Sequence, residues 1–261
     1  MIDHKFKKKF GQNFLQDNNI IRKIVDTANI EENSLIIEIG PGSGALTSIL
    51  TTKGLTISYE IDKELEPLLT EKFGNNDNSV IIYDDFLSRD VKKDLEKYKY
   101  NKLYVVANLP YYITTPIIEK LINEKLDLEK MVLMVQKEVG DRFTSAPKTK
   151  DYSSITVFLN YFFDIKKEFI VSKNAFYPRP NVDSMIISLN KKNNKELAKD
   201  EDKFFKLIRD SFQYKRKTLK NNLKDYNWDI ICDYLLKNNY SETVRAEEIS
   251  LHDYIEMSNL L

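Results

Sequence analysis

The stretch LIIEIGPGSGA at residues 35–45 is an apolar run that passes directly into a glycine-rich turn. A short run of aliphatic and β-branched residues bounded by turn residues predicts a buried strand. Glycines let the backbone turn tightly and approach a ligand closely. The residues that follow, Ala45–Thr51, have helical spacing. A strand, a glycine turn and a helix in this order are typical of nucleotide binding at the carboxyl edge of a parallel sheet.

Strand-like and helix-like patterns alternate on both sides of this stretch. Helical spacing recurs at Asn19–Thr27 and Thr115–Lys125, which favours helices packed on the faces of a parallel sheet. Two later strand candidates, Glu168–Val171 and Val182–Leu189, are joined by a proline-rich turn that is too short for a crossover helix, so we expect this pair to be antiparallel. The other predicted strands are 35–39, 56–59, 80–83, 104–107 and 131–135.

A polar segment divides the chain. Asn190–Asp202 lacks apolar periodicity and is the best candidate for a linker. Helical patterns follow at Phe204–Phe212, Trp228–Leu236 and Ile249–Leu261, which predicts a small helical domain. We therefore expect a first domain at residues 1–190 with a basic arm at 1–18, a linker at 191–202 and a helical domain at 203–261.

Composition excludes several classes of protein. The chain has 261 residues, 42% of them hydrophobic, which is enough for a sizeable core. The single cysteine, Cys232, excludes internal disulfides, and with only His4 and His252 beside it no zinc site is expected. No apolar run is long enough to span a membrane, and the basic start Met1–Phe10 is not followed by the apolar stretch of a secretory signal. These features favour the reducing cytoplasm.

The charges balance overall but cluster locally. Lys+Arg and Asp+Glu are both 40, so the chain has no overall basic field for nucleic acid. Lys7, Lys8 and Lys9 lie near the start, and eight basic residues against one acid lie between positions 203 and 224. Such patches can bind phosphates, although solvated helix faces are an equally good interpretation of charge alone. The candidate RNA-binding residues are Lys7, Lys8, Lys9, Lys215, Arg216, Lys217 and Lys220.

The glycine turn has an acidic partner. Glu60 ends the second predicted strand, where a carboxylate can accept hydrogen bonds from both hydroxyls of a ribose. The spacing of Gly40, Gly42 and Ala45 also satisfies the dinucleotide pattern, so an NAD-dependent oxidoreductase stays open at this point. Asp85, after the third strand, is a candidate acceptor for the amino group of a bound adenine, with a helix cap as the alternative.

The tetrapeptide NLPY at residues 108–111 follows the fourth predicted strand and indicates the chemistry. Adenine N6 is a poor nucleophile because its lone pair is delocalised into the ring. Two acceptors on its N–H groups, the Asn108 side-chain oxygen and the Leu109 carbonyl, would draw N6 toward tetrahedral geometry. They would also stabilise the positive charge that develops on N6 as a methyl group arrives. Pro110 fixes the turn, and Tyr111 offers a flat face for an extruded base. A strand-terminal turn with a core tyrosine is the alternative.

Six motifs in this order resemble the ribosomal RNA adenine dimethyltransferases, the small-subunit enzymes linked to kasugamycin sensitivity. The resemblance covers nearly the whole chain. Tyr112 departs from it, since many members have Asn there, and Ser153 stands where some have Gly. The motifs are KFGQNFL at 9–15, EIGPGSG at 38–44, NLPY at 108–111, QKEV at 136–139, FYPRPNVDS at 176–184 and KRKTLKNNL at 215–223.

The resemblance implies a fold, a cofactor and a substrate. It implies a Rossmann-like, seven-stranded class I methyltransferase sheet with its last strand antiparallel, followed by a helical C-terminal domain. It implies S-adenosylmethionine as methyl donor, Phe176 packed against the flipped base opposite Tyr111, and two adjacent adenines near the 3′ end of small-subunit rRNA as substrate. The residues it places around the cofactor are Asn13, Leu15, Gly40, Glu60, Asp85 and Asn108, to which the glycine turn adds Gly42.

Two further interpretations remain beside this one. A large-subunit rRNA methyltransferase of the macrolide-resistance type would perform the same chemistry at another site, although Leu109 and residues 114–116 favour the small-subunit group. A catalytically silent RNA-binding assembly factor would keep the fold, but the intact 108–111 motif argues against it. We expect a monomer that acts on rRNA within a ribosomal subunit or its precursor and has no membrane association.

Overall fold

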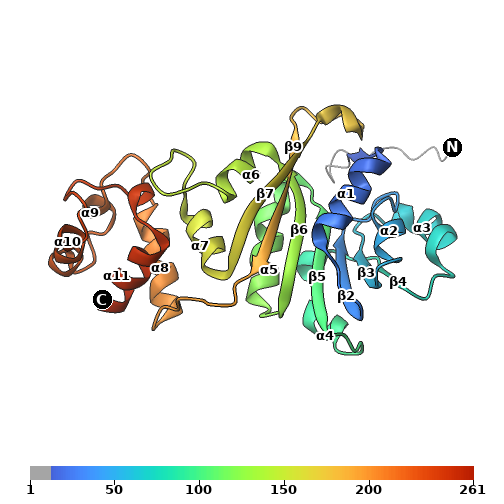
Figure 1. Cartoon of the computed structure of the whole chain (residues 1–261), viewed down its shortest axis with the longest axis horizontal. Helices are drawn as coiled ribbons and strands as arrows, with labels where there is room; N and C mark the ends of the chain where they lie inside the picture. Colours follow the sequence, from blue (N-terminus) through green and yellow to red (C-terminus); the bar gives the residue numbers. More distant parts are fainter. Residues whose placement is uncertain (1–12) are drawn as a thin grey trace. The chain divides into compact units, whose positions relative to one another are not determined.

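The computed structural model describes residues 13–261, which form two compact units (Figure 1). Unit 1 runs to Gly140 and takes in Lys166–Asn190, and unit 2 consists of Asp141–Ile165 and Lys191–Leu261. The sequence prediction assigned residues 141–165 to the first domain, whereas the structure packs them with the C-terminal helices. The reason is apolar packing, because Val157 and Tyr161 are buried in the same cluster as Phe204.

The sheet confirms the predicted fold class. Seven strands lie in the order β4-β3-β2-β5-β6-β9-β7. The pairs from β4 through β6 are parallel, and β9, the last strand of the chain, is antiparallel to β6. The strands are β2 (Ser34–Ile39), β3 (Leu55–Tyr59), β4 (Ser79–Ile82), β5 (Lys102–Asn108), β6 (Leu128–Gln136), β7 (Phe163–Val171) and β9 (Ser184–Lys191).

Central strands are buried on both faces, as the apolar runs predict. Ile36 packs in one cluster with Ile24 of α1, while its neighbour Ile37, which points to the opposite face, is also fully buried. Helix α1 contacts β5 and β6, and α2 contacts β3. The helices that begin in unit 1 are α1 (Asn18–Ala28), α2 (Thr47–Leu50), α3 (Glu66–Phe73), α4 (Val91–Leu95), α5 (Thr114–Asn123) and α6 (Lys137–Phe143), with short 3-10 turns η2 (Lys63–Leu65), η3 (Phe86–Ser88), η4 (Tyr111–Ile113) and η5 (Lys173–Ala175).

A second, two-stranded sheet pairs segments that are far apart in sequence. β1 (Phe14–Leu15) runs antiparallel to β8 (Phe176–Tyr177), with Phe14 opposite Tyr177 and Leu15 opposite Phe176. Strands of two residues have no periodicity to detect, so this pairing could not be predicted from sequence. Its consequence is that residues 13–15 are held next to the segment that contains the FYPRPNVDS motif.

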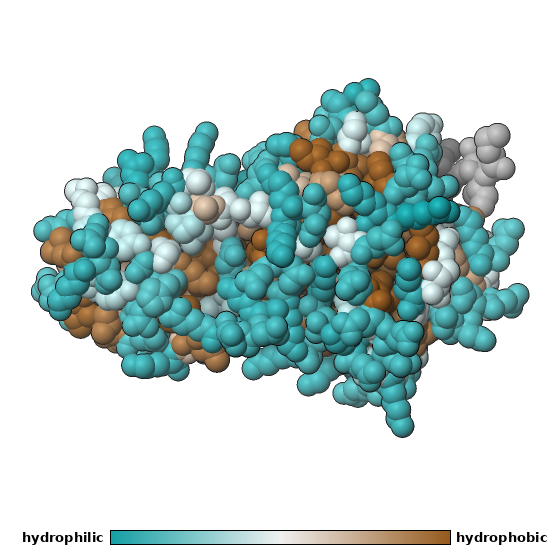
Figure 2. Space-filling view, viewed as in Figure 1, coloured by the Kyte–Doolittle hydropathy of each residue, from teal (hydrophilic) through white to brown (hydrophobic). Residues whose placement is uncertain are grey.

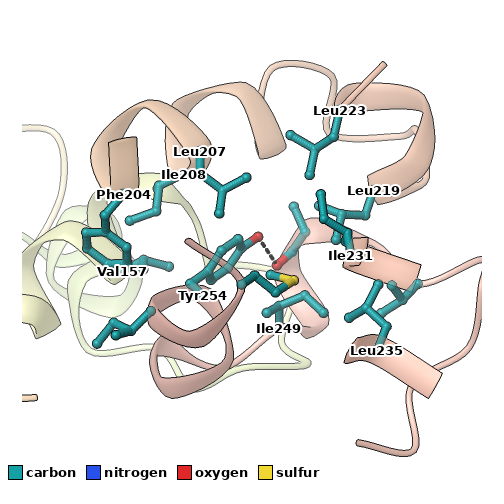
Figure 3. Packing of buried hydrophobic residues seen from close by; sticks show 14 of the residues in the cluster. Val157, Phe204, Leu207, Ile208, Leu219, Leu223, Ile231, Leu235, Ile249 and Tyr254 are labelled. Carbon is teal, nitrogen blue, oxygen red and sulfur yellow. Dashed lines mark hydrogen bonds between the residues drawn. The ribbon is translucent and has the colours of Figure 1, made fainter. Parts of the chain in front are cut away.

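Unit 2 is mainly helical and has its own core. Figure 3 shows Phe204, Leu207 and Ile208 packed near Tyr254, which is fully buried. The Tyr254 hydroxyl donates to the Ala246 carbonyl at 2.9 Å, so burial of this ring leaves its polar group satisfied. The helices are α7 (Ser154–Phe162), α8 (Glu201–Ser211), α9 (Leu219–Asn222), α10 (Trp228–Lys237) and α11 (Leu251–Leu260), with the 3-10 turn η6 (Ala246–Glu248).

Hydrophilic residues cover most of the face in Figure 2, and smaller apolar areas lie between them. None of the helices in residues 13–261 combines the length and the apolar content that a membrane span requires. Within the same residues, no three His, Cys, Asp or Glu side chains are grouped so that they could hold a metal ion.

Candidate cofactor and substrate site

The carboxyl ends of three adjacent strands form one pocket. Strands β3, β2 and β5 are neighbours and parallel, so the loops that follow them meet at one edge of the sheet. Residues from β1, from the glycine turn and from the 108–111 motif line this pocket. Its lining is Asn13, Phe14, Leu15, Ile21, Gly40, Pro41, Gly42, Ser43, Ala45, Leu46, Glu60, Ile61, Asn108, Leu109, Pro110 and Tyr111.

The glycine turn depends on backbone conformations that other residues rarely adopt. Gly40 and Gly42 have φ of 72° and 56°, in the left-handed region. A Cβ atom on Gly42 would lie 2.6 Å from Cε1 of Phe14, so the Phe14 ring occupies the space that any side chain at residue 42 would need. The turn is also fixed to the next strand, because the Gly40 N–H donates to the Tyr59 carbonyl at 2.9 Å.

Glu60 is a buried carboxylate at the pocket. It is only 4% exposed, and its two oxygens accept hydrogen bonds from the backbone N–H groups of Gly42 at 3.0 Å and Asp62 at 2.8 Å. Burial raises the pKa of Glu60, while the backbone hydrogen bonds lower it. The carboxylate thus holds the glycine turn at the pocket, and its contact with a ribose stays a prediction.

A second carboxyl, Glu38, lies behind the turn and is fully buried. One of its oxygens accepts hydrogen bonds from the hydroxyls of Thr47 and Ser58, each at 2.7 Å, and so joins β2, α2 and β3. Its other oxygen, Oε1, has no hydrogen-bond partner among the described residues. The pKa of Glu38 is raised to about 7, because burial and the nearby Glu60 carboxylate raise it by more than the hydrogen bonds from the two hydroxyls lower it. A separate role for Glu38 could not be predicted from sequence, where it is only the first residue of the EIGPGSG motif.

The Asn108 amide has a defined orientation. Its Nδ2 donates to the Asn13 carbonyl at 3.2 Å, which leaves its oxygen as an acceptor. The Leu109 N–H donates to the Met134 carbonyl at 3.2 Å, and the Leu109 side chain is buried. No group in residues 13–261 donates a hydrogen bond to Asn108 Oδ1 or to the Leu109 carbonyl. Both acceptors named by the sequence analysis are therefore available in this part of the chain.

The two aromatic residues predicted to hold the base differ in exposure. Tyr111 lines the pocket, and its hydroxyl lies 2.8 Å from Ser184 Oγ. Burial raises the pKa of Tyr111, while the hydrogen bond with Ser184 lowers it. Phe176 is only 5% exposed and packs in a core cluster with Leu15 and Ile21. Its contact with a base stays a prediction, and the neighbouring Tyr177 is the exposed ring in β8.

Asp85 has a local structural role. Its side chain accepts a hydrogen bond from the Leu87 N–H at 2.9 Å and caps η3. Asp85 is not among the residues that line the pocket. The alternative considered from the sequence, a helix cap, is thus present in the structure, and a contact between Asp85 and the cofactor stays a prediction.

Basic residues of unit 2 gather at one hollow. Lys215 and Arg216 line it together with Lys148, Lys150 and Arg245, as do the acids Glu247 and Glu248. Two contacts fix its walls: Lys215 Nζ donates to the Lys150 carbonyl at 3.0 Å, and the Lys148 N–H donates to the Glu247 carbonyl at 2.7 Å. The sequence could not show that residues 148 and 150 join this cluster. The predicted RNA-binding residues Lys7, Lys8 and Lys9 lie outside the described residues.

A family model described as "Ribosomal RNA adenine dimethylase" matches residues 3–261. The chain belongs to this family. It is similar to a "Ribosomal RNA small subunit methyltransferase A" from Macrococcus caseolyticus, with 40% identity over 98% of this chain and 90% of the relative. A protein of the same name from Streptococcus pyogenes is 41% identical over 98% of this chain and 92% of the relative.

Solved structures agree with the fold. A dimethyladenosine transferase from Plasmodium falciparum matches with a TM-score of 0.76 and 25% identity over 94% of this chain and 95% of that one. The 23S rRNA methyltransferase ErmE matches with a TM-score of 0.75 and 23% identity over 95% of this chain and 99% of that one, which shows a shared fold alone.

Family membership makes the chain an S-adenosylmethionine-dependent rRNA adenine dimethyltransferase. The NAD-dependent alternative is thereby set aside. The pocket fits this cofactor, since the positive-φ glycines open the backbone beside the buried Glu60 carboxylate. Asn13, Leu15, Gly40, Gly42 and Asn108 also line the pocket, and their contact with the cofactor stays a prediction.

We predict that Glu38→Gln flattens the dependence of stability on pH. The folded protein raises the pKa of Glu38 from 4.5 to about 7. The stability that this residue contributes is therefore fully present below the unfolded pKa and is lost as the pH rises through the folded pKa. Between about pH 5 and pH 8, the free energy of unfolding measured in urea should fall on the order of 2–3 kcal/mol more for wild type than for the variant.

The matched control for this prediction is Thr56→Val. Thr56 is fully buried on β3 like Ser58, but its hydroxyl donates to the Gly54 carbonyl rather than to Glu38. The free energy of unfolding of Thr56→Val should lie below that of wild type by the same amount at about pH 5 and about pH 8. Parallel curves for wild type and Glu38→Gln would show that Glu38 does not titrate in this range.

Proposed function

We propose that this enzyme transfers methyl groups from S-adenosylmethionine to N6 of two adjacent adenines near the 3′ end of small-subunit rRNA and produces N6,N6-dimethyladenosine. The observation that carries the proposal is the pair of acceptors, Asn108 Oδ1 and the Leu109 carbonyl, beside the nucleotide pocket. Relatives about 40% identical over nearly the whole chain are named as small-subunit methyltransferases, which favours this rRNA over that of the large subunit.

The two acceptors address the weak nucleophilicity of N6. Each can accept one N–H of the amino group, and together they favour a geometry in which the nitrogen lone pair is released from the ring. They also stabilise the positive charge that grows on nitrogen during transfer, without reorganisation at that moment. No general base is required, because the proton on the methylated nitrogen is acidic after transfer.

The target base must leave its stack before it reaches these oxygens. Extrusion costs a few kcal/mol, which stacking on an aromatic face partly offsets. Tyr111, held by Ser184, offers such a face at the pocket. We propose Phe176 as the opposite face, although in this structure its ring is packed in the core.

The cofactor, when bound, supplies a methyl group on a positively charged sulfur. The glycine turn and Glu60 would hold its nucleoside part, and Asn13 and Leu15 would close the pocket. We propose Asp85 for the adenine amino group of the cofactor. Because a dimethylated product requires two rounds, the pocket must also accept a monomethylated amino group, which has one N–H left.

We propose that the basic hollow of unit 2 binds rRNA phosphates. Lys215 and Arg216 lie in it, and Lys217 and Lys220 lie nearby in sequence. Lys7, Lys8 and Lys9 are proposed to bind RNA as well. We further propose that the enzyme acts as a monomer in the cytoplasm, on rRNA within a small subunit or its precursor, and so takes part in ribosome biogenesis. A catalytically silent assembly factor is disfavoured by the intact acceptor pair.

We predict that Asn108→Ala reduces methyl transfer to unmethylated small ribosomal subunits on the order of 10²-fold, because one acceptor for the developing charge is lost, worth about 2–4 kcal/mol. The measurement is incorporation of labelled methyl groups, with the modified adenines located by mass mapping of the rRNA. Calorimetric affinity for S-adenosylmethionine should stay within a few fold of wild type.

The matched control is Asn101→Ala, an exposed asparagine just before the opposite end of the same strand. Near-wild-type turnover of Asn108→Ala would remove this residue from the chemistry. Transfer by wild type to large-subunit rRNA, and not to small subunits, would contradict the proposed substrate.

We predict that reversing charge at Lys215, Arg216 and Lys217 weakens rRNA binding and flattens its salt dependence. Three lost phosphate contacts should reduce the slope of log affinity against log salt by about 2–3. The control reverses Lys199, Lys203 and Lys237, three exposed lysines of the same unit. Equal slopes for both triple variants would show that residues 215–217 are only solvated.

A further inference from the structure

Exposed apolar side chains of unit 1 concentrate around the pocket. Among the described residues of this unit, six large apolar side chains are exposed, and four of them lie on segments that form or adjoin the pocket. Ile61 lines it, Tyr112 follows Tyr111, Tyr177 pairs with Phe14, and Val182 precedes Ser184 by two residues. Apolar side chains gathered in this way mark an interaction surface, whereas scattered ones need no explanation.

Tyr112 is held outward on a fixed turn. It is 59% exposed, and its hydroxyl makes no hydrogen bond with any residue of 13–261. The surrounding backbone is fixed, since the Ile113 N–H and the Thr114 hydroxyl both donate to the Pro110 carbonyl, at 3.2 and 3.4 Å. The ring is therefore presented to solvent by the residue that follows the 108–111 motif in sequence.

Tyr177 is presented by a second fixed segment. It is 57% exposed, whereas its neighbour Phe176 is buried, because successive residues of a strand point to opposite sides. Exposed Arg179 follows two residues later. The far end of the segment is anchored at Asp183, whose side chain accepts the Lys173 N–H at 2.9 Å and whose carbonyl accepts the Lys137 N–H at 3.0 Å.

We propose that Tyr112, Tyr177 and Arg179 bind the nucleotides that flank the target adenine: the two rings stack on unpaired bases, and Arg179 contacts a backbone phosphate. The inference rests on the proposed function and extends it from the reacting base to its neighbours. Extrusion of one base deprives the adjacent bases of a stacking partner. Aromatic rings and guanidinium groups are the side chains that commonly hold single-stranded RNA.

Stacking also suits a substrate with two adjacent target adenines. While one adenine reacts, its neighbour lies next to the pocket either unmethylated or already dimethylated. A hydrogen bond to N6 of that neighbour would be lost on methylation, whereas the face of its ring is unchanged. Aromatic contacts can therefore hold the flanking adenine at every stage of the reaction.

The test compares Tyr112→Ala and Tyr177→Ala with Tyr112→Phe and Tyr177→Phe. The probe is a hairpin RNA with the sequence of the 3′ end of small-subunit rRNA, carrying 2-aminopurine next to the target adenine. Each alanine variant should bind it about tenfold more weakly than wild type and lose the quenching that stacking produces, while the phenylalanine variants, which keep the ring, bind like wild type. Arg179→Ala should reduce the slope of log RNA affinity against log salt concentration by about 1.

The matched control is Tyr100→Ala. Tyr100 is exposed in the same unit but precedes the amino end of β5, at the opposite edge of the sheet from the pocket. It should leave RNA binding, cofactor affinity and melting temperature unchanged. Alanine variants that bind the probe like wild type overturn the inference, as do phenylalanine variants that are equally impaired. Methyl transfer by wild type is a separate readout. If wild type itself failed to methylate small subunits, the proposed function would be overturned.

Discussion

Asn108 donates from Nδ2 to the Asn13 carbonyl, and this contact decides that its oxygen remains as an acceptor. Asn13 is in place because the adjacent residues 14–15 pair with β8, and Asn108 is in place because β5 is a central parallel strand. The short β1–β8 pair of unit 1 thus determines which atom of the Asn108 amide is left as an acceptor.

The electrostatics of the pocket suit a cationic methyl donor. Glu38 and Glu60 are buried near the glycine turn, and burial raises the pKa of both. Backbone N–H groups and hydroxyls hold the two carboxyls, and no described cation pairs with either. A positive charge bound in the pocket would favour the ionised form of Glu60, which lines it, whereas Glu38 lies behind the turn and does not line the pocket.

Much of the fold and site could be predicted because the signals are local. Apolar runs before Gly40 and Asn108 identified β2 and β5, and the parallel sheet then brought their ends together. Other features depend on packing between distant segments. The β1–β8 pair is too short for periodicity, and the burial of Phe176 follows from that pairing. Residues 141–165 join unit 2 through apolar contacts that no local pattern reveals.

If two oxygens hold the two N–H groups of N6, the two successive methyl transfers depend on Asn108 to different extents, and their rates can be measured separately. Single-turnover rates would be compared for Asn108→Ala and wild type on RNA carrying adenine or N6-methyladenine at the target. We expect Asn108→Ala to slow the first transfer on the order of 10²-fold and the second transfer clearly less, since one N–H remains for the Leu109 carbonyl. Equal losses for both transfers would contradict this expectation.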